Sequence, residues 1–197
     1  MRRRVAREAA ILLYTSQEKE FKQAKKRAAE ILGARVLPSN LEVAEELDRI
    51  ADEFEGLERQ ERLVQMRREA LKLMEFLERF NPRLIGSVWR GTARRNSDID
   101  IEVFSADPEE VLEEIRRRNL EVVEVEKATA SGNHGADEST HIYLALESGV
   151  KAEIIVRSPE KIGEERLCEI YGDPVRGLGI KELRRVLRED PLRRFVP

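Results

Sequence analysis

The chain has 197 residues but only one cysteine, one tryptophan and two histidines, and aromatic residues make up 5% of it. A single cysteine allows neither a disulfide within the chain nor a cysteine-based zinc cluster, which is typical of a reducing compartment. We expect this residue, Cys168, to be a small buried apolar side chain. No segment approaches the roughly 20 consecutive apolar residues that a membrane-spanning helix needs. We therefore predict a cytoplasmic protein without a membrane partner.

Charged residues are abundant instead, at 38% of the chain, although the net charge is only -3. Many Arg, Lys and Glu with few Asn or Gln resemble the ion-pair-rich surfaces of thermophile proteins. The two signs are segregated near the N-terminus. Residues 1–35 carry ten Lys or Arg against four Glu, and residues 36–61 carry nine acids against two Arg. The basic segment could meet the phosphates of a nucleic acid, or the two segments could pair helix to helix.

The first 80 residues have the periodicity of helices. Apolar residues recur at helical spacing in three stretches, 4–32, about 40–56 and about 57–80. We assign residues 1–56 to a helical N-terminal region and residues 57–197 to a second domain. Long amphipathic helices of this kind could also pack against a second copy of the chain, which would make a homo-oligomer.

From residue 83 onward the pattern changes to short runs of alternating or β-branched residues. Five such runs predict strands, at 83–88, 98–104, 120–129, 140–146 and 150–158. A helix from the cap Asp107 to about Asn119 interrupts them, and another lies near the C-terminus. Small polar residues with two glycines predict a mobile loop over 129–139. Because strands and helices are mixed without strict alternation, we predict an α+β fold with a mixed β-sheet.

Residues 86–104, GSVWRGTARRNSDIDIEVF, carry the most informative pattern. A phosphate-binding P-loop would need a lysine beside its second glycine, and this stretch has none. A calcium loop starting at Asp98 would need a glycine at its sixth position and mostly polar residues, which this stretch also lacks. Neither of these two common motifs fits.

The alternation of acidic and apolar residues after the arginines fits a strand at a metal site. Ile99, Ile101 and Val103 would enter the core, while the acids between them, with Asp98 and Asp100 first, would share the other face about 7 Å apart. Carboxylates at that spacing can hold divalent cations between them. Hard oxygen ligands suit Mg²⁺ or Mn²⁺, whose octahedral shell is completed by water and substrate phosphates.

The order GS, RGT and SDID resembles the signature of the DNA polymerase beta-like nucleotidyltransferase superfamily, and most closely the catalytic head of archaeal CCA-adding tRNA nucleotidyltransferases. The resemblance covers roughly residues 57–160. It implies that Gly86 and Ser87 bind the triphosphate of a nucleoside triphosphate, and that Arg90 and Thr92 lie near it. Backbone N–H groups, a hydroxyl and a guanidinium are suitable partners for phosphate oxygens.

The same resemblance implies three catalytic, metal-binding carboxylates. Asp98 and Asp100 would hold two magnesium ions, and Glu153, in the segment KAEIIV, would supply the third acid from a later strand. An acid inside such an apolar strand is costly unless a cation pairs with it. The archaeal enzymes frequently have aspartate at this third position, whereas this chain has glutamate.

The reaction implied by the resemblance is the transfer of a nucleoside monophosphate from an NTP, such as ATP, to an acceptor hydroxyl. The archaeal enzymes are much longer and carry further domains that hold tRNA. The motif alone therefore does not identify the acceptor. RNA, a protein or a small molecule such as an aminoglycoside are all candidate acceptors. An alternative is a catalytically idle module of the same fold that binds RNA or a protein through its N-terminal helices.

Other polar and aromatic residues near the motif are expected to have no direct role. We expect His134 and His141 to be surface or structural residues and Trp89 to pack beneath the phosphate-binding turn. We expect Glu102 either to support the metal ligands or to be a surface charge.

Overall fold

The structure is a computed structural model that describes residues 1–132 and 135–197, and it describes no side chain between residues 130 and 137. The contacts divide the described chain into two units. Unit 1 comprises Met1–Arg59 together with Leu167–Pro174 and Pro197, and unit 2 comprises Gln60–Arg166 and Val175–Val196.

Unit 1 is built from α1 (Arg2–Tyr14), α2 (Phe21–Ile31) and the first part of α3 (Asn40–Phe76). Its core contains many buried alanines, whose small side chains let the helices approach closely. Ion pairs join α1 to α3, with Arg2 2.7 Å from Glu42 and Arg7 2.8 Å from Glu53. Within this unit the oppositely charged segments therefore do pair helix to helix.

The long helix α3 is kinked at Gly56, whose backbone has φ 52° and ψ -132°. A positive φ is readily adopted by glycine and costly for other residues. The two helices predicted to meet at Gly56 are thus continuous except for this kink. The second part of α3 belongs to unit 2.

Unit 2 contains a five-stranded mixed sheet with the strand order β1-β2-β5-β4-β3. β2 and β5 are parallel, and the other neighbouring pairs are antiparallel. This arrangement confirms the α+β prediction. The strands are β1 (Arg83–Ile85), β2 (Ile99–Phe104), β3 (Glu121–Gly132), β4 (Gly135–Ala145) and β5 (Lys151–Arg157).

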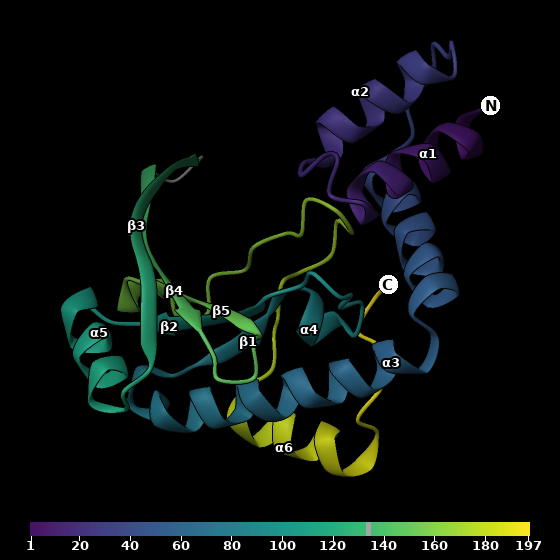
Figure 1. Ribbon diagram of the computed structural model, residues 1–197. Helices are drawn as coiled ribbons and strands as arrows, with labels where there is room; N and C mark the ends of the chain where they lie inside the picture. Colours follow the sequence, from purple (N-terminus) through teal and green to yellow (C-terminus); the bar gives the residue numbers. More distant parts are fainter. Residues whose placement is uncertain (133–134) are drawn as a thin grey trace. The chain divides into compact units, whose positions relative to one another are not determined.

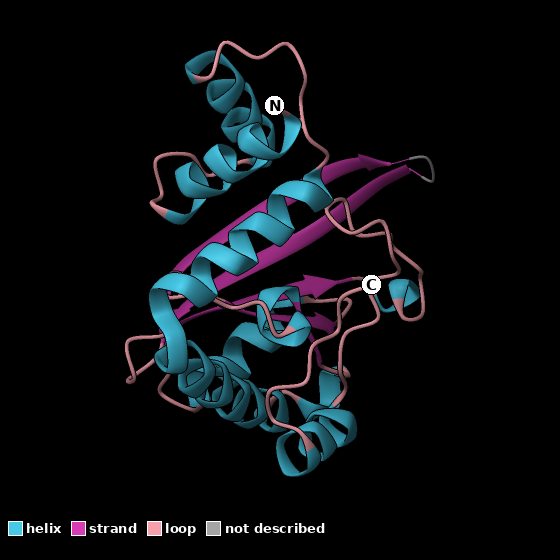
Figure 2. Cartoon of the chain, turned by 90° about the vertical axis from the view of Figure 1, so that its right-hand side faces the viewer, coloured by secondary structure: helices cyan, strands magenta, loops and turns pink. Residues whose placement is uncertain are grey.

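One face of the sheet is covered by helices, and the second part of α3 runs along it (Figure 1). α5 (Pro108–Arg117) and α6 (Ile180–Glu189) complete this layer, and α6 is tied to α3 by an ion pair between Arg184 and Glu75 at 2.8 Å. Figure 2 shows the strands with these helices to one side. Apolar residues of the helices and strands form one continuous core between the two layers. The polar face of the sheet is consequently free to carry a site.

Two local predictions are wrong. The strand predicted over 83–88 ends at Ile85, because Gly86–Arg90 form the short helix α4. The predicted loop over 129–139 belongs largely to a long hairpin, in which β3 continues to Gly132 and β4 begins at Gly135. Pairing of β4 with β3 extends these strands although their residues are small and polar. His134 lies outside the described residues.

The structure also bears on the predictions made for Cys168 and for membrane-spanning segments. Cys168 is half-buried rather than buried, because it lies in an irregular segment whose backbone bonds to Gly172 and Asp173 instead of packing into the core. Among the described residues, no helix is both long enough and apolar enough to cross a membrane.

Candidate active site

Gly86 and Ser87 form the turn at which β1 ends and α4 begins, and they are the first two residues of α4. Gly86 has φ 69°, and a Cβ atom built on it would lie 1.9 Å from Oδ2 of Asp100. No residue other than glycine fits there without displacing this carboxylate. The backbone N–H of Thr92 donates to the carbonyl of Ser87 at 3.0 Å, which closes the short helix behind the turn. The turn and the Asp100 carboxylate therefore lie in direct contact.

Alternation in β2 sorts its residues onto two faces as predicted. Ile99, Ile101 and Val103 are fully buried in the core. Asp100 lies on the opposite face, and Asp98 directly precedes the strand on the chain and is exposed. The apolar half of the pattern thus fixes which way the acids point.

Glu153 is brought next to Asp100 by the parallel pairing of β5 with β2. The register places the two residues directly opposite each other. On the other side of β5, the antiparallel register places Tyr143 of β4 opposite Glu153. Two of the three acids predicted from sequence, Asp100 and Glu153, therefore lie side by side on one sheet face, and the third, Asp98, directly precedes β2.

Electrostatics at these acids is unfavourable in the absence of a cation. Burial, reinforced by the charges of Glu153 and Asp98, raises the pKa of Asp100 to about 7. Although the residue is exposed, partial desolvation of its carboxylate also raises the pKa of Asp98, where nearby Lys151 opposes the shift and Glu153 adds to it. No basic group contributes to the shift at Asp100 among the residues that the structure describes. A bound cation would relieve this repulsion.

Glu102, the next acid along β2, has a different environment. It is buried, and it pairs with Arg157 at 3.2 Å and with Arg166. Arg157 pairs in turn with Glu164 at 2.9 Å. The interpretation of Glu102 as a surface charge is therefore wrong, because the positive partner that this strand position needs is supplied by the protein itself.

His141 contacts Glu153 of the site, although we expected it to be a surface or structural residue. Its Nδ1 lies 2.5 Å from Oε1 of Glu153, and its Nε2 lies 2.8 Å from the hydroxyl of Ser139. Burial and the charges of Glu153 and Glu126 raise the pKa of the neighbouring Tyr143 to about 12. Alternate polar residues in the strand segment STHIY were the available signal, but their partner strand could not be read from the sequence.

The remaining predicted residues lie around α4. Ser87 and Thr92 are half-buried beside the turn. Arg90 is buried, lies over the ring of Trp89 and donates to the carbonyl of Phe195 at 2.9 Å. This contact gives Arg90 a packing role against the C-terminal segment, and its phosphate contact stays a prediction. Trp89 is buried, as expected of a packing residue.

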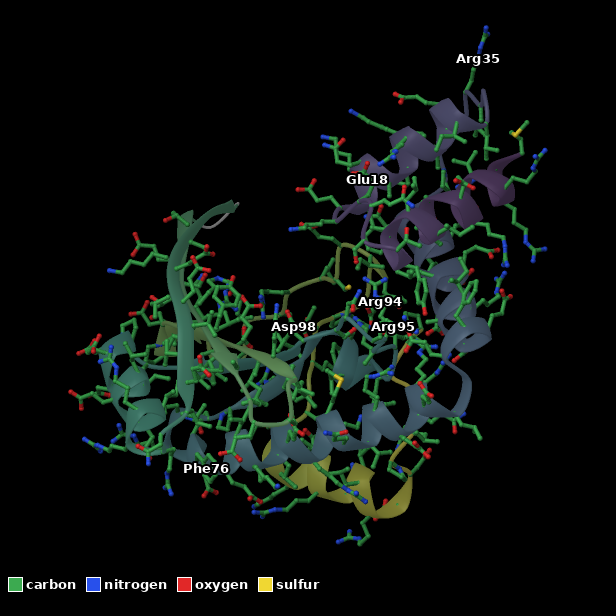
Figure 3. All side chains as sticks on the ribbon, in the orientation of Figure 1. Glu18, Arg35, Phe76, Arg94, Arg95 and Asp98 are labelled. Atoms are coloured by element: carbon green, nitrogen blue, oxygen red, sulfur yellow. The ribbon has the colours of Figure 1, made fainter. Side chains whose placement is uncertain are left out.

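A cavity of about 470 Å³ opens beside Asp98. Its walls carry the basic residues Arg62, Arg95 and Lys151. Figure 3 labels Arg95 and Asp98, which both belong to the loop between α4 and β2. The volume falls in the range of small-molecule sites, and the basic walls favour an anionic ligand.

The acids fit a hard divalent cation that shares its shell with a substrate. Within the described part of the chain, no three His, Cys, Asp or Glu side chains are placed to enclose a metal ion by themselves. Mg²⁺ seldom uses such an all-protein cage and is commonly held by one or two carboxylates with phosphates and water. The contact between the Gly86 turn and Asp100 would bring phosphate and metal together.

The model of the nucleotidyltransferase domain family matches residues 67–166, just over half of the chain. The chain belongs to this family, and the predicted superfamily resemblance is confirmed at that level. The closer likeness to archaeal CCA-adding enzymes stays a prediction. No curated protein matches the chain.

Several solved structures are similar to part of the chain. A cytoplasmic RNA terminal U-transferase is 22% identical, over 47% of this chain and 28% of its own, with a TM-score of 0.35. The Cid1 poly(U) polymerase is 20% identical, over 50% of this chain and 32% of its own, also with a TM-score of 0.35. A variant of that polymerase bound to MgATP is 19% identical, with a TM-score of 0.31, over 51% of this chain and 33% of its own. This chain thus spans about a third or less of the length of these proteins, and the likeness assigns it neither a nucleotide nor an acceptor.

Proposed function

We propose that this protein is a metal-dependent nucleotidyltransferase that moves a nucleoside monophosphate from an NTP to an acceptor hydroxyl. The observation that carries the proposal is the position of Asp100 between the Gly86 turn and Glu153. The Gly86 turn contacts its carboxylate on one side, and Glu153 lies opposite it on the next strand. Membership of the nucleotidyltransferase domain family supports the same reaction.

Each residue has a task that follows from its position. The backbone N–H groups after Gly86 and the hydroxyl of Ser87 would bind the triphosphate. The carboxylates of Asp98 and Asp100 would hold Mg²⁺ or Mn²⁺ beside it, and Glu153 would hold the cation on the acceptor side. When bound, two such cations lower the pKa of the attacking hydroxyl and neutralise the leaving pyrophosphate.

The bonds of the reaction balance without any further co-reactant. The acceptor oxygen bonds to the α-phosphorus as the bond from that phosphorus to the bridging oxygen breaks. Pyrophosphate leaves, and the hydroxyl proton passes to water or to a carboxylate of the site. In this scheme the Gly86 turn and the three acids orient the two reactants and offset the charge that they carry.

RNA is the acceptor to test first. The motif resembles the heads of enzymes that act on tRNA, and the basic cavity beside Asp98 suits a phosphate-bearing strand. The N-terminal helices remain candidates for RNA binding or for assembly into a homo-oligomer.

The test is transfer of label from a panel of α-labelled nucleoside triphosphates, with Mg²⁺ or Mn²⁺, into RNA, protein or small molecules of a cell extract. Asp98→Asn, Asp100→Asn and Glu153→Gln should each lower transfer by at least about 100-fold. Glu165→Gln, at an exposed acid outside the site, serves as the matched control and should transfer normally. Absence of labelled product from the wild-type protein in every fraction would identify an idle module instead.

A further inference from the structure

We propose that His141 is a positioning residue that holds the Glu153 carboxylate ready for the cation. The inference rests on the proposed function, because it assigns Glu153 to the metal. It adds two residues of β4, His141 and Ser139, to a site that the sequence motif confines to the turn, β2 and β5 (Figure 1).

The geometry is that of a chain of two hydrogen bonds. Glu153 Oε1 lies 2.5 Å from Nδ1 of His141, and the Ser139 hydroxyl lies 2.8 Å from Nε2 of the same ring. His141 and Ser139 are two residues apart on β4 and therefore point to the same face of the sheet. The side chains of His141 and Glu153 retain only 22% and 20% of their exposure, so water competes weakly for the bond between them.

Both ring nitrogens of His141 have a defined partner. A carboxylate oxygen accepts, so Nδ1 carries the proton and donates to Glu153. Nε2 shares the second hydrogen bond with the hydroxyl of Ser139. With both nitrogens engaged, the ring cannot turn without breaking a hydrogen bond. Ser139 thus fixes the ring, and the ring fixes the carboxylate.

The consequence for the site follows from what lies on either side of Glu153. Asp100 lies opposite it on β2 and repels its charge, whereas His141 lies on the β4 side and holds it. The hydrogen bond from His141 therefore fixes the Glu153 carboxylate on the β4 side, where it would meet a cation without first having to be ordered. Hydrogen-bonded partners of metal-binding carboxylates commonly matter 10–100-fold for affinity or activity.

The proposal is tested by measuring the affinity for Mn²⁺ in the presence of a non-hydrolysable NTP analogue, by electron paramagnetic resonance, at one fixed pH. His141→Ala and the bulkier His141→Leu should both weaken Mn²⁺ binding about 10–100-fold. His141→Asn, whose amide can donate from nearly the same place as Nδ1, should recover most of the loss. Ser139→Ala should have a smaller effect, because it removes only the second bond.

The kinetics should show the same order of variants. kcat should fall in His141→Ala and His141→Leu while the KM for the NTP changes little, because the triphosphate is bound by the Gly86 turn and not by β4. Melting temperatures of the four variants should not follow this order, which separates positioning from a general loss of stability.

Different outcomes overturn different claims. Wild-type affinity in both His141→Ala and His141→Leu, or an Asn variant as weak as the Ala variant, would overturn the role of His141 alone. Wild-type affinity in Glu153→Gln would remove the third acid from the metal site and His141 with it. A wild-type protein that binds no Mn²⁺ beside the analogue would overturn the proposed function together with this inference.

Discussion

Asp100 and Glu102 are two residues apart on the same face of β2, yet the charged groups around their two carboxylates have opposite signs. Glu102 is buried against two arginines, whereas among the described residues the charges that shift the pKa of Asp100 are those of Glu153 and Asp98, and its carboxylate contacts the glycine turn. A purely structural strand would satisfy both acids. The contrast supports the proposal that a bound cation balances the charge of Asp100.

Asp100→Asn should raise the stability of the metal-free protein above neutral pH. Below about pH 4 the carboxyl is protonated in both states and contributes nothing. Between its ordinary value of 3.8 and the folded pKa of about 7, only the unfolded chain loses the proton, so the free energy of unfolding falls as the pH rises. Above about pH 7 the carboxyl is ionised in both states, and the free energy of unfolding falls no further.

Denaturation in urea with a chelator, at pH 4 and pH 8, measures this effect. The Asn variant should exceed the wild type at pH 8 and match it at pH 4. An Asn variant that is less stable than the wild type at pH 8 would mean that Asp100 serves the architecture of the fold.

Glu102→Gln should have the opposite effect on stability. It removes the carboxylate that buried Arg157 shares with Arg166, and because Arg157 keeps its pair with Glu164, we expect a cost of about 1–3 kcal/mol. The free energy of unfolding in urea at pH 7 should fall by that amount. A loss of under about 1 kcal/mol, as is typical of an exposed ion pair, would contradict the description of this network.

At the scale of elements, the junction of β1 with α4 decides the geometry of the site. Gly86→Ala would place a methyl group 1.9 Å from Asp100 Oδ2, in a backbone conformation with φ 69° that already disfavours side chains. The turn or the carboxylate must then move. We expect transfer activity to fall at least about 100-fold, because displacement of about 1 Å at a reacting site has effects of this size.

Gly163→Ala is the matched control for this substitution. Gly163 has φ 86° and therefore similar backbone strain, but a Cβ there would meet no atom within 4 Å. It should lower stability by about 1–3 kcal/mol and leave the kcat of transfer close to that of the wild type. Equal losses of kcat in the two variants would mean that strain, and not contact with Asp100, explains the effect of Gly86→Ala.

The elements also show how far the sequence could predict the site. Alternation in β2 and the Gly-Ser pair are local patterns, and both predicted local geometry that the structure contains. The position of His141 beside Glu153 is set by the register of β4 against β5, which depends on the turn between them and not on any residue of the motif. The direction of Arg90 was not predictable either, because its partner, Phe195, is 105 residues away in the chain.

At the scale of the whole molecule, Arg67 connects distant parts of unit 2. It is fully buried, and its guanidinium donates to the carbonyls of Val88 and Trp89 in α4 and to those of Pro191 and Arg193 near the C-terminus. Burial lowers the pKa of this guanidinium to about 10. One side chain thus ties the helix behind the Gly86 turn to both α3 and the C-terminal segment.

Arg67→Met should lower the free energy of unfolding by about 3 kcal/mol or more, because several buried carbonyls lose their donor at once. Arg68→Met, at the exposed neighbouring position of α3, is the control and should change it by less than about 0.5 kcal/mol. Urea denaturation followed by circular dichroism compares the two variants. Similar stabilities would show that the carbonyls find other partners and that Arg67 is dispensable.

We also propose that residues 1–56 form a helical region attached to a nucleotidyltransferase domain over 57–197. The helices of unit 1 have a core of their own, separate from the core of the sheet. The short segment Leu167–Pro174 nevertheless belongs to unit 1 by its contacts, and Asn40 donates to the carbonyl of Glu169 at 3.2 Å. The composition of the chain could not predict that Leu167–Pro174 belongs to unit 1, because this depends on contacts between residues far apart in sequence.

The most direct measurement is a crystal structure with Mn²⁺ and a non-hydrolysable NTP analogue, in which anomalous scattering locates the ions. We predict Mn²⁺ about 2.1 Å from carboxylate oxygens of Asp98 and Asp100, with the triphosphate on the turn at Gly86 and Ser87. Triphosphate bound elsewhere, or ions that avoid both aspartates while the analogue is present, would contradict it.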